Sequence, residues 1–305
     1  MEDKNQKLPS TKIQCEKPIY INTHSNRWKY WNFNIEIFTF FKRGEEMNAI
    51  NIDIVNEIIE VVKKAYEESK NIKNKNIKNK ELNDIVTDVD LLMEEKIVSF
   101  IKEKFPEHSI YSEEVGNDNK HNEYQWLIDP IDGTINFAAG LPLFATSIAL
   151  RKNKDTVLGI IFDWSANDIY YTIKGHGAFC NDELIHVSDN ELLKDSIVSF
   201  CLTSHYNQEH IKSVLNVEEK LADKVRGLRL IVSAAIELAW CASGKIDGCI
   251  NVKPSIGLSS AAGKLLVQEA GGKVTNLSGN ERNEIDTMLV TNGLIHDEIV
   301  KALNI

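Results

Sequence analysis

The chain has 305 residues, of which 43% are hydrophobic and 26% are charged, and its formal net charge is −10. This length and composition are ordinary for a globular protein that forms one large domain or two packed halves. An acidic chain without a basic block is unlike a nucleic-acid-binding protein, so we expect no nucleic-acid partner.

The sequence carries no membrane or secretory signal. No run approaches the ~20 apolar residues of a membrane span, and the N-terminus lacks the apolar segment of a signal peptide. The five cysteines show no C-x-x-C spacing, and an odd count in a long chain indicates reduced thiols. We therefore expect a cytoplasmic protein with no membrane partner.

The first residues differ from the rest of the chain. Between Ile19 and Phe41 the sequence is crowded with aromatic residues but has no helical or strand period, whereas Ile50 to Tyr66 has apolar residues at helical spacing. We hypothesise that residues 1–46 are an N-terminal appendage, with Met47 as the true start. Residues 47–305 then form the main domain, with a metal-binding half (47–188) and a second half (189–305).

Residues 71–112 predict a loop, a helix and a short strand. The Asn/Lys-rich stretch from Asn71 to Lys80 predicts a loop between two helices. The second helix follows Asp84–Asp90 and ends near Phe105, before Pro106. Residues 109–112 then form a short predicted strand that leads to Glu113.

The most informative stretch runs from Trp126 to Phe137. Residues 126–128 predict a buried strand that stops at Asp129-Pro130, because proline cannot extend the ladder of hydrogen bonds. Asp129 and Asp132 then face a turn closed by Gly133, and Thr134 opens a short helix. Carboxylates suit Mg²⁺, and the Gly133 and Thr134 N–H groups suit phosphate oxygens. The alternative is an ordinary surface turn, in which Asp, Pro and Gly are common.

The remaining chain alternates strands and helices irregularly. It predicts strands at 143–150, 157–162, 169–173, 197–202, 246–252, 273–275 and 289–293, and helices at 232–243, 259–270 and from about His296. A layered α/β or α+β domain follows from this pattern.

The stretch from Trp126 to Phe137 resembles the first signature of the inositol monophosphatase family, which are Mg²⁺-dependent sugar phosphatases. The resemblance runs from about Asn48 to the C-terminus. The family pattern D-x-V-T-x-x-D-x-x-x-E is met by Asp84, Val86, Thr87, Asp90 and Glu94, and A-A-G-x-x-L-x-x-E-A-G-G matches residues 261–272. The resemblance implies the layered αβαβα sandwich of the inositol monophosphatase and fructose-1,6-bisphosphatase type.

The resemblance also implies roles for individual residues. Glu113, Asp129 and the Ile131 carbonyl would hold a first Mg²⁺, and Asp129 and Asp132 would share a second. Thr134 and Asp90 would take the proton of the water that attacks the phosphomonoester. The implied substrate contacts are Asp132, Gly133, Thr134, Arg229, Ser233, Ala234 and Lys253.

One position departs from the family pattern. The Asp that completes the second metal's ligands is replaced by Ser259, and no aspartate occurs between Asp247 and Asp286. A neutral hydroxyl is a weak ligand, so either the second metal is held more loosely or the chain is a non-catalytic relative.

The spacing bears on the substrate as well. Only 15 residues separate Glu113 from Asp129, and Lys253-Pro254 stands where inositol-specific enzymes carry an acidic segment. Both features resemble the archaeal-type enzymes, which act on inositol 1-phosphate and fructose 1,6-bisphosphate. A 3′-phosphoadenosine-5′-phosphate phosphatase remains an alternative. The resemblance further implies a homodimer.

Overall fold

The computed structural model describes residues 51–72, 77–81, 84–120, 122–201, 207–253, 257–281 and 287–304. The chain divides into two units, residues 1–47 and 48–305, and every described residue belongs to the second. The proposed appendage at residues 1–46 and the proposed start at Met47 therefore lie outside the described residues.

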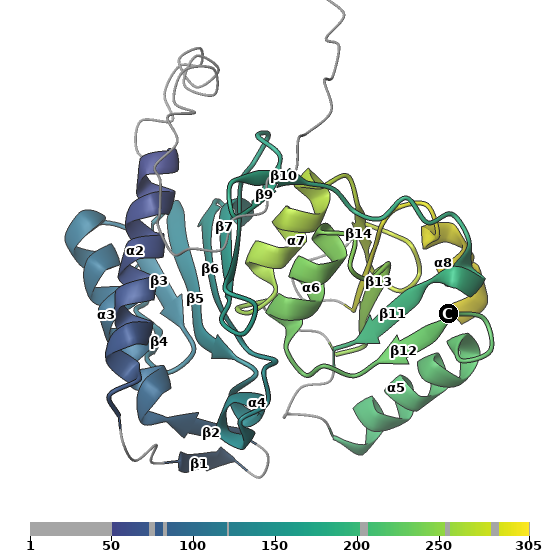
Figure 1. Ribbon diagram of the computed structural model, residues 1–305, viewed down its shortest axis with the longest axis horizontal. Helices are drawn as coiled ribbons and strands as arrows, with labels where there is room; N and C mark the ends of the chain where they lie inside the picture. The colour runs from purple at the N-terminus through teal and green to yellow at the C-terminus, as the bar shows by residue number, and fades with distance from the viewer. Residues whose placement is uncertain are drawn as a thin grey trace, which may run out of the picture. The chain divides into compact units, whose positions relative to one another are not determined.

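The described chain is a stack of five layers in the order helices, sheet, helices, sheet, helices (Figure 1). The first layer consists of α2 (Ile52–Ser69) and α3 (Asp88–Lys104), which pack on one face of the larger sheet. Asn51 begins α2 by accepting the Ile54 N–H at 3.1 Å, and apolar residues at helical spacing give the helix one buried face. The predicted αβαβα sandwich is confirmed.

The larger sheet has eight strands in the order β10-β9-β8-β7-β6-β5-β3-β4. In chain order they are β3 (Ser109–Ser112), β4 (Gly116–Asn117), β5 (Tyr124–Asp132), β6 (Ala145–Lys152), β7 (Asp155–Asp163), β8 (Asp168–Ile173), β9 (Ala178–Cys180) and β10 (Glu183–Ile185). Strands β3 and β5 are parallel, whereas β5 to β8 form an antiparallel meander. Helices cover both faces of the central strands, and the sequences of these strands are therefore continuous apolar runs.

The middle layer consists of α6 (Ala234–Ala242) and α7 (Ala261–Glu269), which bury apolar residues against both sheets. Small residues let α7 approach the larger sheet closely. A Cβ on Gly159 of β7 would lie only 2.9 Å from the Ala262 backbone, so no larger residue fits there without a shift. This close packing holds the segment before α7 over strand β6.

The smaller sheet has five strands in the order β12-β11-β13-β15-β14. They are β11 (Ile197–Phe200), β12 (Gly227–Arg229), β13 (Gly248–Asn251), β14 (Lys273–Thr275) and β15 (Met288–Thr291), and the turn η1 (Leu193–Asp195) precedes β11. The last layer, α5 (Gln208–Leu221) and α8 (His296–Leu303), packs on the outer face of this sheet. Across the described residues, no helix combines the length and apolar character needed to cross a membrane.

Two sequence predictions were wrong in detail. The stretch predicted as a loop at 71–80 contains β1 (Ile77–Glu81), which pairs antiparallel with β2 (Asp84–Thr87). This strand has no buried apolar face, since Ile77 is 53% exposed. It forms through backbone pairing with β2 and not through an apolar pattern that the sequence could show. Strand β5 also continues past Pro130 to Asp132, because the ladder with β6 shifts register between Asp129 and Asp132.

Candidate active site

The end of β5 places two aspartates next to a tight turn. Asp129 pairs with Ser147 of β6 and Asp132 pairs with Ala145, with the register shift between the two pairs. Gly133 follows with φ +92°, and a Cβ there would lie 2.8 Å from the Leu143 carbonyl oxygen. Only glycine tolerates both conditions. The helix α4 (Thr134–Ala139) begins directly after this turn, as the sequence predicts.

Asp90 and Thr134 meet although 44 residues separate them. The Thr134 hydroxyl oxygen lies 3.2 Å from Asp90 Oδ1 and 2.9 Å from the Ile131 carbonyl oxygen. Asp90 Oδ2 accepts the Thr87 backbone N–H at 2.9 Å and also contacts the Thr87 hydroxyl. The Thr87 hydroxyl in turn accepts the Asp90 N–H, so the two residues form the capping box at the start of α3. Burial raises the pKa of Asp90 to about 6, against the lowering effect of the bonds from Thr87.

Glu113 reaches the site from the turn after β3. Its side chain is exposed, and its backbone N–H donates to the Ile128 carbonyl at 3.1 Å, which ties the turn to β5. Glu94 of α3 is buried, and its Oε1 accepts the N–H groups of Glu114 and Val115 at 3.2 and 3.1 Å. These bonds hold the turn that carries Glu113 next to the end of β5.

Asp132 is held by the second half of the chain. Its Oδ2 accepts the Ser233 hydroxyl at 2.6 Å and the Ala235 N–H at 2.7 Å, at the first turn of α6. Asn136 ties the same regions together, because its Nδ2 donates to the carbonyls of Leu143 and Ile231 at 2.8 Å. Burial raises the pKa of Asp132 to about 7, although the bonds from Ser233 and Ala235 act in the opposite direction.

Asp129 is the buried acid of the site that lacks a full set of partners. It is 5% exposed, and its Oδ1 atom is buried without a hydrogen bond. Burial raises its pKa well above the usual range, and the negative charges of Glu113 and Asp132 add to the effect. An orphaned carboxylate oxygen among other acids is costly in a metal-free protein and suits a hard divalent cation.

The donor set therefore fits Mg²⁺, but the cage is not closed as it stands. Within the ranges that the structure describes, no three acidic, imidazole or thiol side chains already converge tightly enough to hold a metal ion. The Glu113 side chain already interacts with Asp129, because both its charge and a hydrogen bond from it raise the pKa of Asp129. A bound cation would offset the repulsion among these acids.

Ser259 lies where the departure from the family pattern matters. Its carbonyl accepts the Ser147 hydroxyl at 3.1 Å, and Ser147 is the residue that pairs with Asp129 across β5 and β6. The turn before α7 thus brings Ser259 over the acidic strand end. The residue at this position is a serine and not an aspartate.

The predicted substrate contacts fall into two groups. Ser233 and Ala234 stand at the start of α6 beside Asp132, and Ser233 caps that helix as the sequence predicts. Arg229 is exposed at the end of the edge strand β12, and its Nη1 donates to the neighbouring Leu228 carbonyl at 2.9 Å. Lys253 follows β13, and its backbone N–H donates to Asn251 Oδ1 at 2.9 Å. The roles of Arg229 and Lys253 stay predictions.

Sequence reasoning assigned no role to several residues that build the site. Thr87 and Glu94 belong to a recognised pattern, and the T-x-x-D capping box was the signal for Thr87. Asn136 and Ser147 carry no local signal, because their partners are distant in sequence. Glu237 is fully buried and accepts the Ile231 N–H at 3.3 Å, and burial raises its pKa to about 8.

The five-layered fold and the crowded acids at the end of β5 agree with what known proteins of one family show. A model of the inositol monophosphatase family matches residues 44–304. A protein of Thermotoga maritima named fructose-1,6-bisphosphatase/inositol-1-monophosphatase is 38% identical over 224 residues, which cover 72% of this chain and 83% of that protein.

Solved structures agree with this match. The Thermotoga maritima inositol monophosphatase superimposes with a TM-score of 0.73 at 33% identity, over 83% of this chain and 97% of that one. An inositol monophosphatase/NADP phosphatase complexed with Mg²⁺ and phosphate gives a TM-score of 0.71 at 25% identity, over 83% and 95% of the two chains. The chain belongs to the inositol monophosphatase family. Membership implies a phosphatase, and hence a hydrolase.

Proposed function

We propose that this protein is a Mg²⁺-dependent phosphomonoesterase that hydrolyses inositol 1-phosphate, fructose 1,6-bisphosphate or both. The observation that carries the proposal is the buried Asp129, whose Oδ1 has no hydrogen bond while Asp132, Glu113 and Asp90 crowd around it. When bound, Mg²⁺ supplies the charge that offsets these acids and polarises the phosphate ester and the attacking water.

The chain's own residues perform the remaining tasks. Asp90 accepts a proton through the Thr134 hydroxyl, 3.2 Å away, because a pKa of about 6 leaves the carboxylate mostly ionised at neutral pH. The backbone N–H groups of Gly133 and Thr134 hold phosphoryl oxygens at the start of α4. Asp132, fixed by Ser233 and Ala235, orients the substrate side of the site.

The proposed substrate class rests on two predicted contacts and on a relative. In this proposal Arg229 and Lys253, the two cations among the predicted substrate contacts, bind a second phosphate or polyol oxygens. The relative from Thermotoga maritima carries both phosphatase activities in its name. A homodimer forms part of the proposal and rests on the resemblance alone.

A second candidate function follows from Ser259. A family member without the third acidic ligand is a non-catalytic protein if the loss abolishes metal binding. The contact of the Ser259 backbone carbonyl with Ser147, the partner of Asp129, supports this candidate because it brings Ser259 close to the site.

The test measures phosphate release from inositol 1-phosphate, fructose 1,6-bisphosphate and 3′-phosphoadenosine 5′-phosphate across a Mg²⁺ titration. Turnover of a sugar phosphate that is lost in Asp129→Asn supports the proposal and identifies the substrate. Turnover of the nucleotide alone contradicts it.

The Ser259→Asp variant separates the two candidate functions. If the natural site is intact, wild type turns over and the variant changes only the Mg²⁺ midpoint. If the site is impaired, wild type releases no phosphate at any Mg²⁺ concentration and the variant gains activity. A circular-dichroism melt confirms that each variant is folded.

A further inference from the structure

Strand β5 carries one extra residue at the place where the two aspartates lie. Asp129 pairs with Ser147 and Asp132 pairs with Ala145. Two residues of β5 lie between these pairs, opposite the single residue Thr146 of β6. This is the arrangement of a β-bulge, a feature found next to active sites because it redirects side chains. The aspartates are thus three apart on β5, while their partners are two apart on β6.

The extra residue determines which way the aspartates point. In a regular strand, residues three apart point to opposite faces of the sheet. Residues that pair across strands share a face, and so do Ser147 and Ala145, which are two apart on β6. Asp129 and Asp132 therefore share the face that the middle helices cover, where Asp132 bonds to the start of α6. Without the bulge, one of the two carboxylates would point away from the site.

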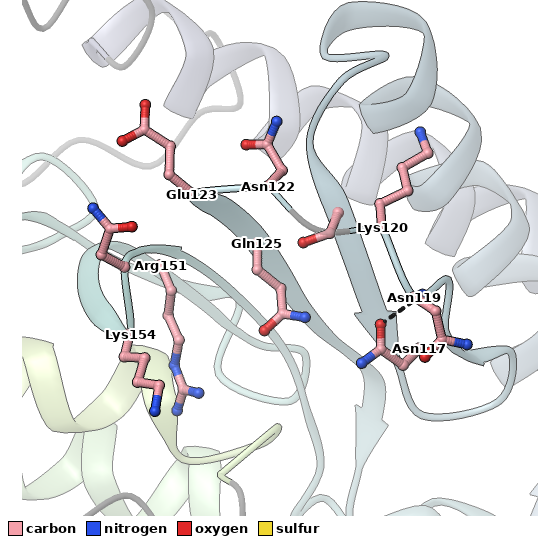
Figure 2. A pocket seen from close by; sticks show the side chains of 10 residues that line it. Asn117, Asn119, Lys120, Asn122, Glu123, Gln125, Arg151 and Lys154 are labelled. Carbon is pink, nitrogen blue, oxygen red and sulfur yellow. Dashed lines mark hydrogen bonds between the residues drawn. The ribbon is translucent and has the colours of Figure 1, made fainter.

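The opposite end of the same strands has no such shift. Gln125 of β5 pairs in register with Ser109 of β3 and with Arg151 of β6, and all three line a polar pocket (Figure 2). From Gln125 to Asp129 the pairing of β5 with β6 is continuous. The bulge is therefore confined to the acidic end of β5.

Two side chains hold the bulge from the face opposite to the aspartates. Thr146 is 1% exposed, and its hydroxyl donates to the Pro130 carbonyl at 2.6 Å. Trp164 Nε1 donates to the Thr146 hydroxyl oxygen at 3.0 Å. An indole N–H can only donate, so the one hydrogen of the hydroxyl is directed to Pro130. Since proline has no N–H for the ladder, this side-chain bond ties the bulge to β6 where a backbone bond is missing.

Trp164 is itself fixed by packing. It follows β7 and is 9% exposed, and its ring stacks on those of Tyr66 and Phe162, with centroids 3.7 and 3.8 Å away. Tyr66 belongs to α2 and Phe162 to β7, so two separate elements hold the indole. A side chain packed in this way keeps one rotamer, and the direction of its N–H is preset.

We propose that Thr146 and Trp164 are positioning residues for the cation of the acidic site. They hold the bulge in the form that directs Asp129 and Asp132 to the same ion. Neither residue touches the ion or the substrate, because both act through the Pro130 peptide. This role rests on the proposed function in one respect only, which is that the acids at the end of β5 bind Mg²⁺.

The alternative is that the two bonds only stabilise the fold, since buried polar groups need partners in any protein. In that case, loss of the Thr146 hydroxyl lowers stability and leaves the Mg²⁺ affinity unchanged. Thr172 of β8 provides the matched comparison. It is also buried, and its hydroxyl also donates to a backbone carbonyl, that of Gly177, at 2.9 Å. Strand β8 lies two strands beyond β6, away from the acids.

The experiment is isothermal titration calorimetry of the full chain with Mg²⁺ alone, with no substrate present. Thr146→Val replaces the hydroxyl with a methyl group of similar size, whereas Thr146→Ser keeps the hydroxyl. Trp164→Phe removes the indole N–H and keeps an aromatic ring. Thr172→Val is the control. The melting temperature of each protein is measured without Mg²⁺.

Thr146→Val should weaken Mg²⁺ binding by about tenfold, the lower end of the range for loss of a group that orients metal ligands. Thr146→Ser should stay within about twofold of wild type, because the bond to Pro130 can form. Trp164→Phe should lose about threefold, since Thr146 keeps its hydroxyl but not its fixed direction. Thr172→Val should bind Mg²⁺ as wild type does, although both valine variants melt about 3 °C lower.

Equal Mg²⁺ affinity in wild type and Thr146→Val overturns the positioning role and leaves the proposed phosphatase intact. An equal loss of affinity in Thr172→Val also overturns it. If wild type binds Mg²⁺ but hydrolyses none of the three phosphate esters, the proposed function fails, and the variants still decide the positioning role. If wild type binds no Mg²⁺, both proposals fail. If Thr146→Val does not fold, Trp164→Phe decides the question, and an unchanged affinity in that variant overturns the role.

Discussion

Two buried aspartates, one in each half of the chain, have opposite surroundings. Asp247 precedes β13 and is 7% exposed, with Oδ1 accepting the Ser188 hydroxyl at 2.6 Å and Oδ2 accepting the Ile197 N–H at 2.7 Å. Asp129 is 5% exposed, has an Oδ1 without a hydrogen bond, and faces the charges of Glu113 and Asp132. Both are buried acids, but only Asp247 has both oxygens satisfied.

The difference teaches that burial alone does not mark a functional acid. A buried carboxylate whose oxygens are both bonded fixes the chain, because losing it leaves donors unsatisfied. A buried carboxylate with one unbonded oxygen and like charges around it is costly in a metal-free protein, and it suits a cation. His296, also in the second half of the chain, is another buried titratable residue whose side-chain polar atoms are all hydrogen-bonded. Its ring nitrogens lie 2.8 and 2.9 Å from the hydroxyls of Thr291 and Thr275.

The largest expected effect is at Asp129. Asp129→Asn should lower kcat/KM by about 10³-fold or more, because the charge that binds the cation is lost. The variant should also lose the rise in melting temperature that Mg²⁺ causes in wild type. Differential scanning fluorimetry with and without Mg²⁺ checks this independently of substrate. A variant that keeps a tenth of the activity and the full Mg²⁺ shift contradicts the assignment.

The matching change at Asp247 should do the reverse. Asp247→Ala leaves the Ser188 hydroxyl and the Ile197 N–H without an acceptor, so we expect a loss of about 3 kcal/mol in the free energy of unfolding. The Mg²⁺ shift and the activity of the folded fraction should be unchanged. Urea denaturation measures the loss, with Asp247→Asn as the milder control. If Mg²⁺ no longer stabilises Asp247→Ala, the contrast between the two aspartates fails.

His296 makes the stability of the second half depend on pH. Burial lowers the pKa of His296 to about 4, and the Lys273 charge adds to this, whereas Asp297 opposes it. The unfolded histidine, with a pKa near ~6.5, binds a proton first as the pH falls, so stability should decrease between pH 6.5 and 4. The contribution of this group is up to about 3 kcal/mol. It is fully present above pH 6.5.

Urea denaturation from pH 4 to 7 measures this dependence, and His296→Gln is the comparison. The slope of stability against pH should be shallower in the variant, even if the variant is less stable throughout. An unchanged slope would show that other groups account for the loss in acid.

The smallest expected effect concerns the backbone next to the acidic site. Val232 has φ +62°, which is unfavourable for a β-branched residue, and it directly precedes the Ser233 that binds Asp132. Val232→Gly should relieve this strain and raise the free energy of unfolding by about 1 kcal/mol. Chemical denaturation measures the gain, with Val198→Ala in the buried β11 as a control that should lose stability. A destabilised Val232→Gly would show that the side chain's packing outweighs the strain.

Local patterns predicted much of the fold and part of the site. The apolar spacing of α2, the strand before Asp129, the short helix at Thr134 and the Ser233 cap are all carried by neighbouring residues. The errors arose where pairing overrides local preference. The polar strand β1 forms only because β2 lies beside it, and β5 passes Pro130 only because the register with β6 shifts there.

The sequence by itself determined which residue types stand at the end of β5 and in which order. Gly133, Thr134 and the two aspartates are set by a short stretch, because a tight turn and a helix start depend on local backbone conformation. Only the tertiary structure decided which distant groups meet them. The Asp90–Thr134 contact spans 44 residues and the Asp132–Ser233 bond spans 101.

The same reason applies at the other end of the sheet. Ser109, Gln125 and Arg151 form one strip only because three strands pair in one register, and no local period in the sequence records that register. Long-range pairing and the packing of helices between two sheets therefore decided which polar residues lie together.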